Sequence, residues 1–146
     1  MFALDTNVLV YAADRTAGTR RFAARQIVDR AAPSGAVLTE QSLFEFFRAA
    51  TRKAKMSFAE AEMVVRKFAR DFRIAPSHAR VLDDTLALRS RYHLGVWDAR
   101  LLAVCEAHGC DHLLSEDLQD GATYGTVGVL NPFNPGNAAR IAQVLS

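Results

Sequence analysis

The chain opens with Met1-Phe2-Ala3-Leu4-Asp5-Thr6-Asn7-Val8-Leu9-Val10-Tyr11. Four apolar residues end abruptly at Asp5, which predicts a short buried strand followed by a turn into a helix that Asn7 begins. This arrangement places a carboxylate directly at the end of the first strand.

Outward from this segment, short apolar runs alternate with longer segments of helical periodicity. Ser57 followed by Glu60 has the pattern of a capping box, and Gly109 is a helix stop. Strands are expected over Ala36–Leu38, Arg73–Ala75, His112–Leu114 and Thr126–Leu130, and helices over about Arg20–Ala32, Gln41–Lys53, Phe58–Phe72, Pro76–Tyr92, Val96–His108 and Asn137–Leu145. Because parallel strands need crossover helices, this alternation predicts an α/β fold of three layers, α/β/α, around a central parallel sheet of about five strands.

Size and composition indicate one soluble globular domain spanning residues 1–146. Of the 146 residues, 50% are hydrophobic and 23% are charged, as in ordinary globular proteins. Cys105 and Cys110 lack the paired spacing of a zinc site and are interpreted as structural thiols in a reducing compartment. No run of about 18 apolar residues occurs, so neither a signal peptide nor a membrane span is expected, and the cytoplasm is the predicted location.

Charge is distributed unevenly along the chain. Residues 1–100 carry 17 Lys and Arg against 11 Asp and Glu, whereas residues 101–146 carry one Arg against five acids, so the two parts have net charges of +6 and −4. Fifteen of the 18 basic residues are Arg, whose planar fork suits phosphate. Solvated helix faces would also explain such charge runs.

Four acidic residues lie where the predicted sheet would bind a ligand. In parallel α/β sheets, ligands bind beyond the carboxyl ends of the strands. Two like charges about 4 Å apart repel by about 4 kcal/mol at an effective dielectric of 20, so four carboxylates at one place need protons or cations. A site made only of oxygens favours Mg²⁺ or Mn²⁺ over zinc. The four acids are Asp5 after the first strand, Glu45 on the helix after the second, Asp98 at the start of a helix, and Asp117 after the fourth strand.

Each acid also has a simpler explanation. Asp5 and the Ser115–Asp117 segment could be helix caps, and Asp98 suits the positive end of a helix dipole. Glu45 shares a helix face with Gln41, Arg48 and Arg52 that could be solvated. The opposite face is the expected buried stripe of this helix: Leu43, Phe46, Phe47, Ala50 and Ala54.

Taken together, four segments resemble the motifs of the PIN-domain ribonucleases, and in particular VapC-like toxins of bacterial type II toxin–antitoxin systems. Arg100 departs from the family pattern, which has an apolar residue there. The resemblance runs from Phe2 to about Phe133. Its four segments are Asp5–Tyr11, Thr39–Phe46, Val96–Ala99 and Leu113–Gly121.

The resemblance implies a divalent-metal-dependent endoribonuclease that leaves a 5′-phosphate and a 3′-hydroxyl. It implies that Asp5, Glu45, Asp98 and Asp117 bind Mg²⁺ or Mn²⁺, and that Asn7 and Ser115 orient water or a carboxylate. It further implies an RNA substrate, a cognate antitoxin and a homodimer, with no membrane partner. The basic residues expected to guide the RNA backbone are Arg48, Arg52, Lys53 and Lys55.

Three other functions remain open at the sequence level. An aspartyl phosphatase would need a second aspartate where Asn7 stands, and a receiver-like Mg²⁺-binding regulatory domain would need a lysine at the end of a late strand. A catalytically inactive PIN-type module that binds RNA or Mg²⁺ is the principal alternative. The scattered histidines do not suggest a metal-free catalytic pair. The phenylalanines Phe44, Phe46 and Phe47 are expected in the core.

Overall fold

The computed structural model describes all 146 residues, Met1–Ser146. A six-stranded sheet with strand order β3-β2-β1-β4-β6-β5 lies at its centre. All neighbouring strands are parallel except β5 and β6, which form an antiparallel hairpin. The strands are β1 (Phe2–Leu4), β2 (Val37–Thr39), β3 (Arg73–Ala75), β4 (His112–Leu114), β5 (Thr123–Tyr124) and β6 (Val127–Leu130).

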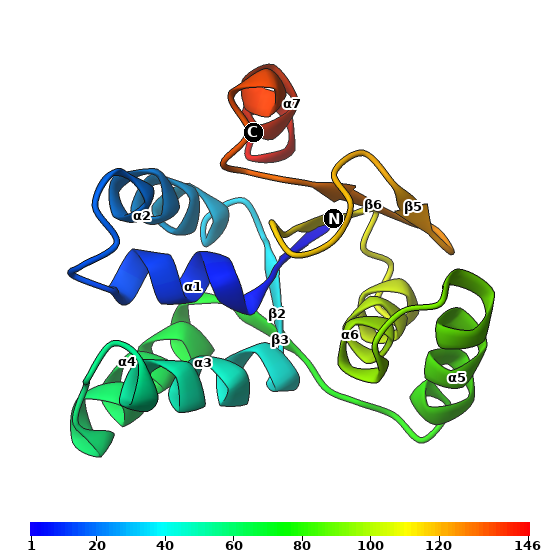
Figure 1. Cartoon of the computed structure of the whole chain (residues 1–146), viewed down its shortest axis with the longest axis horizontal. Coiled ribbons are helices and arrows are strands. Elements are labelled where there is room, and N and C mark those ends of the chain that lie inside the picture. The colour runs from blue at the N-terminus through cyan, green and yellow to red at the C-terminus, as the bar shows by residue number, and fades with distance from the viewer.

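Seven α-helices and one 3₁₀ turn surround the sheet (Figure 1). They are α1 (Thr6–Ala13), α2 (Thr19–Ala31), α3 (Glu40–Arg52), α4 (Phe58–Asp71), α5 (Val81–Tyr92), α6 (Val96–Ala107), the 3₁₀ turn η1 (Pro135–Asn137) and α7 (Ala138–Val144). None of these helices is long and apolar enough to cross a lipid bilayer.

The helices form two outer layers, one on each face of the sheet. Because side chains alternate along a strand, neighbouring residues of β1 belong to different cores. Leu4 packs in a core with α1–α4 and α7, whereas Ala3 packs in a second core with α5 and α6. Figure 1 shows α1–α4 and the α5–α6 pair on opposite sides of the strands. The predicted three-layer α/β/α fold is therefore confirmed.

The expected strand count of about five is wrong by one strand. The additional strand is β5, a two-residue segment that pairs only with β6. Gly125 makes the tight turn between them with a φ of +59°, a conformation that glycine adopts without a steric penalty. Two residues are too few to produce an alternating pattern in the sequence.

Two further expectations are corrected. Helix α5 begins at Val81 rather than at Pro76, because the intervening segment is anchored to other elements: the Ser77 N–H donates to Glu40 Oε2 and a ring nitrogen of His108 contacts the Pro76 carbonyl at 2.9 Å. Phe44 was expected in the core and is instead 73% exposed, whereas Phe46 is fully buried.

The strand order explains where a ligand site can form. From β1, the chain adds β2 and β3 on one side of the sheet and β4 and β6 on the other. The connections that follow β1 and β4 therefore leave the sheet in opposite directions. Parallel α/β sheets bind ligands at such a point, beyond the carboxyl ends of the two strands. Asp5 follows β1 and Ser115 follows β4 at this point.

Candidate functional site

Asp5 lies at the centre of the candidate site and is only 7% exposed. It is the N-cap of α1, and its Oδ1 accepts a hydrogen bond from the Thr6 N–H at 2.6 Å. Its Oδ2 accepts a 2.6 Å hydrogen bond from the Ser115 hydroxyl, and its own N–H donates to the Leu114 carbonyl. The capping explanation is thus correct for Asp5, but the cap leaves its carboxylate buried against β4.

Burial changes the protonation of Asp5. Loss of solvent is the largest of the causes that together raise the pKa of this carboxyl from 3.8 to about 6; the Ser115 and Thr6 hydrogen bonds oppose the rise, and the charges of Asp117 and Glu45 add to it. A carboxylate that water no longer stabilises favours either a proton or a cation.

Asn7 and Ser115 connect Asp5 to Asp117. The Asn7 amide nitrogen lies 3.0 Å from Asp5 Oδ2 and 3.1 Å from Asp117 Oδ2. The Ser115 hydroxyl, which donates to Asp5, also accepts the Asp117 N–H at 3.2 Å. The side-chain oxygen of Asn7 is buried without a hydrogen-bond partner. This set of contacts holds the carboxylates of Asp5 and Asp117 close together.

Glu45 reaches the same pocket from α3. Its two carboxylate oxygens accept hydrogen bonds of 3.0 Å from the Thr6 hydroxyl and from the Gln41 amide. Glu45 is half-buried and forms no ion pair with the arginines on its helix face. The solvated ion-pair face considered from the sequence is therefore incorrect for this residue.

Asp98 enters the pocket from the first turn of α6. Burial and the charges of Asp117 and Glu45 raise the pKa of its carboxyl, and no hydrogen bond counteracts this rise. Arg100, which departs from the family pattern, donates to Gln41 Oε1 at 2.8 Å, and Gln41 in turn donates to the Trp97 carbonyl at 3.0 Å. Arg100 therefore helps to hold α6 against α3 instead of packing as an apolar residue.

The four acids share one cavity of about 620 Å³. We refer to this cavity as the acidic pocket. Three basic residues predicted to bind nucleic acid also line it, whereas Lys55 lies in the turn after α3 and does not. Among its lining residues are Asp5, Asn7, Glu45, Asp98 and Asp117, together with Arg48, Arg52 and Lys53.

The chemistry of the acidic pocket suits a hard divalent cation. The ligands it offers are carboxylate oxygens, and it lacks the Cys and His ligands typical of zinc sites. No three His, Cys, Asp or Glu side chains are grouped as a complete metal site. In this arrangement Thr6 and Gln41 bind Glu45, and Asn7 binds Asp117, so the carboxylates are not gathered around one point. The fit to a cation therefore rests on the type of ligand atoms and on the pocket that they share.

Sequence reasoning missed several residues of the pocket. Thr6 and Gln41 hold Glu45, but an isolated Thr or Gln carries no chemical signal in a sequence. Glu116 accepts hydrogen bonds from the Tyr11 hydroxyl and from Arg20. Asp120 accepts hydrogen bonds from the Asn131 N–H and from the side-chain amides of Asn134 and Asn137, so it anchors the segment before α7.

The comparisons with solved structures show similarity of fold. A toxin–antitoxin complex from Klebsiella pneumoniae aligns with a TM-score of 0.67 and 23% identity over 91% of this chain and 98% of that one. VapC20 from Mycobacterium tuberculosis, described as a sarcin-ricin loop cleaving toxin, aligns with a TM-score of 0.66 and 14% identity over 88% and 99%. FitAcB from Neisseria gonorrhoeae aligns with a TM-score of 0.66 and 17% identity over 92% and 99%.

Comparison by sequence gives the family directly. No curated protein sequence matches the chain. The sequence profile of the PIN domain, however, matches residues 2–119, which span every acid of the pocket. The chain therefore belongs to the PIN domain family.

Proposed function

We propose that residues 1–146 form a single PIN domain that acts in the cytoplasm as a divalent-metal-dependent endoribonuclease and as the toxin of a toxin–antitoxin pair. The observation that carries the proposal is the convergence of Asp5, Glu45, Asp98 and Asp117 on one pocket rimmed by basic side chains. These acids come from four separate segments of the chain. Membership of the PIN domain family supports the nuclease assignment.

In this proposal each side chain has a defined role. Asp5, Glu45, Asp98 and Asp117 hold Mg²⁺ or Mn²⁺, which supplies an activated water and neutralises charge on the phosphate when bound. Ser115 and Asn7 orient the carboxylates of Asp5 and Asp117 through the hydrogen bonds described above. The orientation matters because a small displacement of a catalytic group greatly reduces the rate.

Arg48, Arg52 and Lys53 are proposed to bind the RNA backbone. A pocket lined by carboxylates repels phosphate, so a substrate needs cations beside it. Arg48 and Arg52 are exposed on α3, one turn apart, and line the same cavity as the acids. Phosphate contacts of this kind give binding that weakens as salt concentration rises.

The nuclease proposal is tested by replacing Asp98. Its carboxylate lines the acidic pocket and accepts no hydrogen bond, so its replacement removes no hydrogen bond from the fold. Asp98→Asn should reduce cleavage of structured RNA in Mn²⁺ by at least about 100-fold, because it removes a charged ligand. Asp83→Asn is the matched control, since Asp83 also occupies the first turn of a helix and is exposed on α5. Binding of RNA without cleavage by the wild-type chain would favour the inactive RNA-binding alternative.

The toxin role rests on the partners of structurally similar proteins. The Klebsiella pneumoniae structure is a toxin–antitoxin complex, and another similar structure contains FitAB bound to a DNA fragment. We infer that this chain binds a cognate antitoxin, which inhibits it. Expression of the chain alone should arrest growth, and Asp5→Asn should remove the arrest; equal toxicity of both proteins would contradict the proposed metal-dependent activity.

A homodimer is proposed through the surface formed by Phe44, Val96 and Trp97. The Gln41–Trp97 hydrogen bond brings the start of α6 beside α3, where Phe44 lies one turn after Gln41. Trp97 is 63% exposed, and Val96 next to it is also exposed. Neighbouring exposed apolar side chains of this size are typical of protein interfaces.

A further inference from the structure

Arg20 belongs to a compact cluster beside the acidic pocket, which we call the Arg20 cluster: Tyr11, Arg20, Glu116 and Phe133. The Arg20 guanidinium lies 5.3 Å from the centre of the Tyr11 ring and 5.2 Å from the centre of the Phe133 ring. The two rings meet edge to face with their centres 5.3 Å apart. Glu116 accepts a hydrogen bond from the Tyr11 hydroxyl and forms an ion pair with Arg20.

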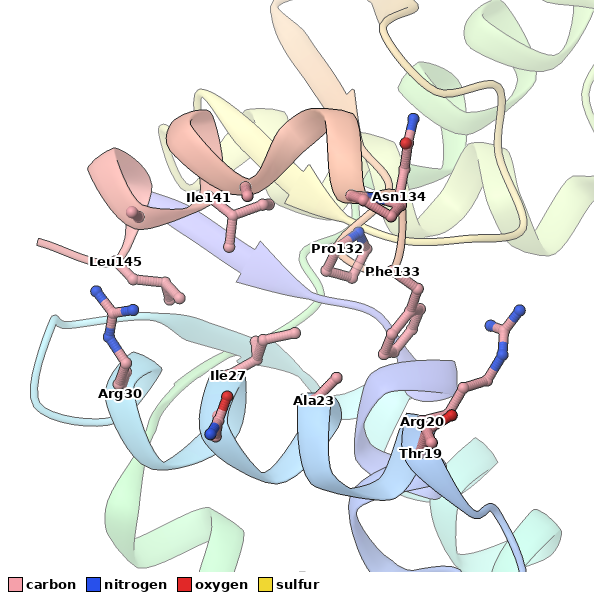
Figure 2. Close-up of a pocket in the computed structure, with 14 residues that line it drawn as sticks. Thr19, Arg20, Ala23, Ile27, Arg30, Pro132, Phe133, Asn134, Ile141 and Leu145 are labelled. Carbon is pink, nitrogen blue, oxygen red and sulfur yellow. The ribbon is translucent and has the colours of Figure 1, made fainter.

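The cluster joins four distant parts of the chain. Tyr11 lies on α1, Arg20 on α2, Glu116 on the turn after β4, and Phe133 on the segment before α7. Figure 2 shows Arg20 and Phe133 at one end of an apolar groove of about 520 Å³ between α2 and α7, with Arg30 at the other end. Tyr11 and Glu116 line the acidic pocket, so the cluster separates the two cavities.

Glu116 stands between two residues of the proposed active site, Ser115 and Asp117. After β4, the Ser115 N–H still donates a hydrogen bond to β6, at the Leu130 carbonyl. The Asp117 N–H donates to the Ser115 hydroxyl rather than to a strand. Side chains therefore hold the turn of residues 115–117, with Asp5 and Asn7 on one side and the Arg20 cluster on the other.

We propose that Arg20 is a positioning residue for the acidic pocket: by binding Glu116 it fixes the turn that carries Asp117. This inference rests on the proposed function of that pocket. The Glu116 side chain is only 16% exposed, so its charge is poorly screened by water. Its ion pair with Arg20 is therefore weakened less by solvent than a fully exposed pair would be.

The geometry calls for arginine in particular. A guanidinium is planar, so it can lie near two aromatic rings and still donate hydrogen bonds to a carboxylate. A lysine at this position would keep the charge but lose the planar fork. Groups that orient metal ligands typically change metal affinity or activity by 10–100-fold when they are removed.

The test compares Arg20→Gln with Arg30→Gln in the full-length protein. Both substitutions remove one positive charge from α2, but Arg30 lies at the far end of the groove, away from the turn (Figure 2). Arg20→Gln should weaken Mn²⁺ binding, measured by calorimetry, by about 10-fold and lower kcat for RNA by a similar factor, with less than about a threefold change in KM. Arg30→Gln should leave Mn²⁺ affinity and kcat as in the wild type.

Hydrogen–deuterium exchange without metal gives a readout that is independent of activity. The amides of residues 115–118 should exchange faster in Arg20→Gln than in Arg30→Gln, because the turn loses one of its two anchors. Phe133→Leu removes one of the two rings without changing charge and should shift exchange, Mn²⁺ affinity and kcat in the same direction. It also keeps the proposal testable if Arg20→Gln fails to fold.

Two outcomes would overturn the proposal. Equal exchange and equal Mn²⁺ affinity in the Arg20 and Arg30 variants would show that Arg20 does not fix the turn. Faster exchange in Arg20→Gln with unchanged Mn²⁺ affinity and unchanged kcat would show that Arg20 stabilises the turn but does not position the metal-binding residues. If the wild-type chain neither binds Mn²⁺ nor cuts RNA, the proposed function itself is wrong, and this result is distinct from either of the first two.

Discussion

The protonation of Asp5 links the candidate site to the stability of the protein. Burial raises the pKa of this carboxyl from 3.8 to about 6, so the metal-free folded chain binds a proton more tightly than the unfolded chain does. The resulting stabilisation is fully present below about pH 4 and is lost as pH rises through about 6. Its upper limit is roughly 3 kcal/mol, since each pKa unit corresponds to about 1.4 kcal/mol.

We therefore predict that Asp5→Asn stabilises the metal-free protein at pH 7 relative to wild type, and has a much smaller effect at pH 4. Urea denaturation in the presence of a chelator at both pH values measures the difference. Asp83→Asn, at an exposed position on α5, is the control for loss of one negative charge. The same pH dependence in Asp5→Asn and wild type would contradict the burial effect.

At the residue scale, the sequence predicted the acids better than it predicted the residues around them. Asp5 and Asp117 follow strands and Asp98 starts a helix, so their positions in the chain place them at one edge of a parallel sheet. Thr6 and Gln41 were not predicted because their role depends on contacts between helices. The Arg20–Glu116 pair joins residues 96 positions apart, which no local pattern can indicate.

At the element scale, the capping box at the start of α4 is a local signal that the structure confirms. Ser57 and Glu60 form the predicted capping box at the start of α4, with the Glu60 N–H donating to the Ser57 hydroxyl and the Ser57 N–H donating to the Glu60 carboxylate. We predict that Ser57→Ala lowers the free energy of unfolding by about 1 kcal/mol.

RNA cleavage by Ser57→Ala should be unchanged at a temperature where the variant is folded, because α4 does not line the acidic pocket. Thermal denaturation and a cleavage assay on the same preparation test both parts. A loss of activity without a loss of stability would mean that α4 has a direct role in the site.

Elements were missed where tertiary contacts overrode local preference. Pro76 and Ser77 resemble a helix start, yet this segment contacts Glu40 and His108 instead, and α5 begins only at Val81. The β5–β6 hairpin was missed because β5 is two residues long. The apolar period is clear in α3 and α4, and the predicted types and order of the main strands and helices are confirmed.

At the scale of the whole molecule, the proposed homodimer makes a direct prediction. Phe44→Ser should convert the dimer to a monomer, because it removes a 73% exposed apolar side chain from the proposed interface. Phe22→Ser is the matched control, since Phe22 is 75% exposed but lies on α2. Sedimentation velocity distinguishes the two. A wild-type monomer, or dissociation by both substitutions, would contradict the proposed interface.

Convergence of the four acids on one cation is the central claim of this account. The most direct test is a crystal of the chain soaked in Mn²⁺, with anomalous diffraction used to locate the ion. We predict a Mn²⁺ peak in the acidic pocket, in contact with Asp5, Asp98 and Asp117, and its loss in Asp98→Asn crystals. An ion bound elsewhere only, or none at a concentration that supports RNA cleavage, would contradict the claim.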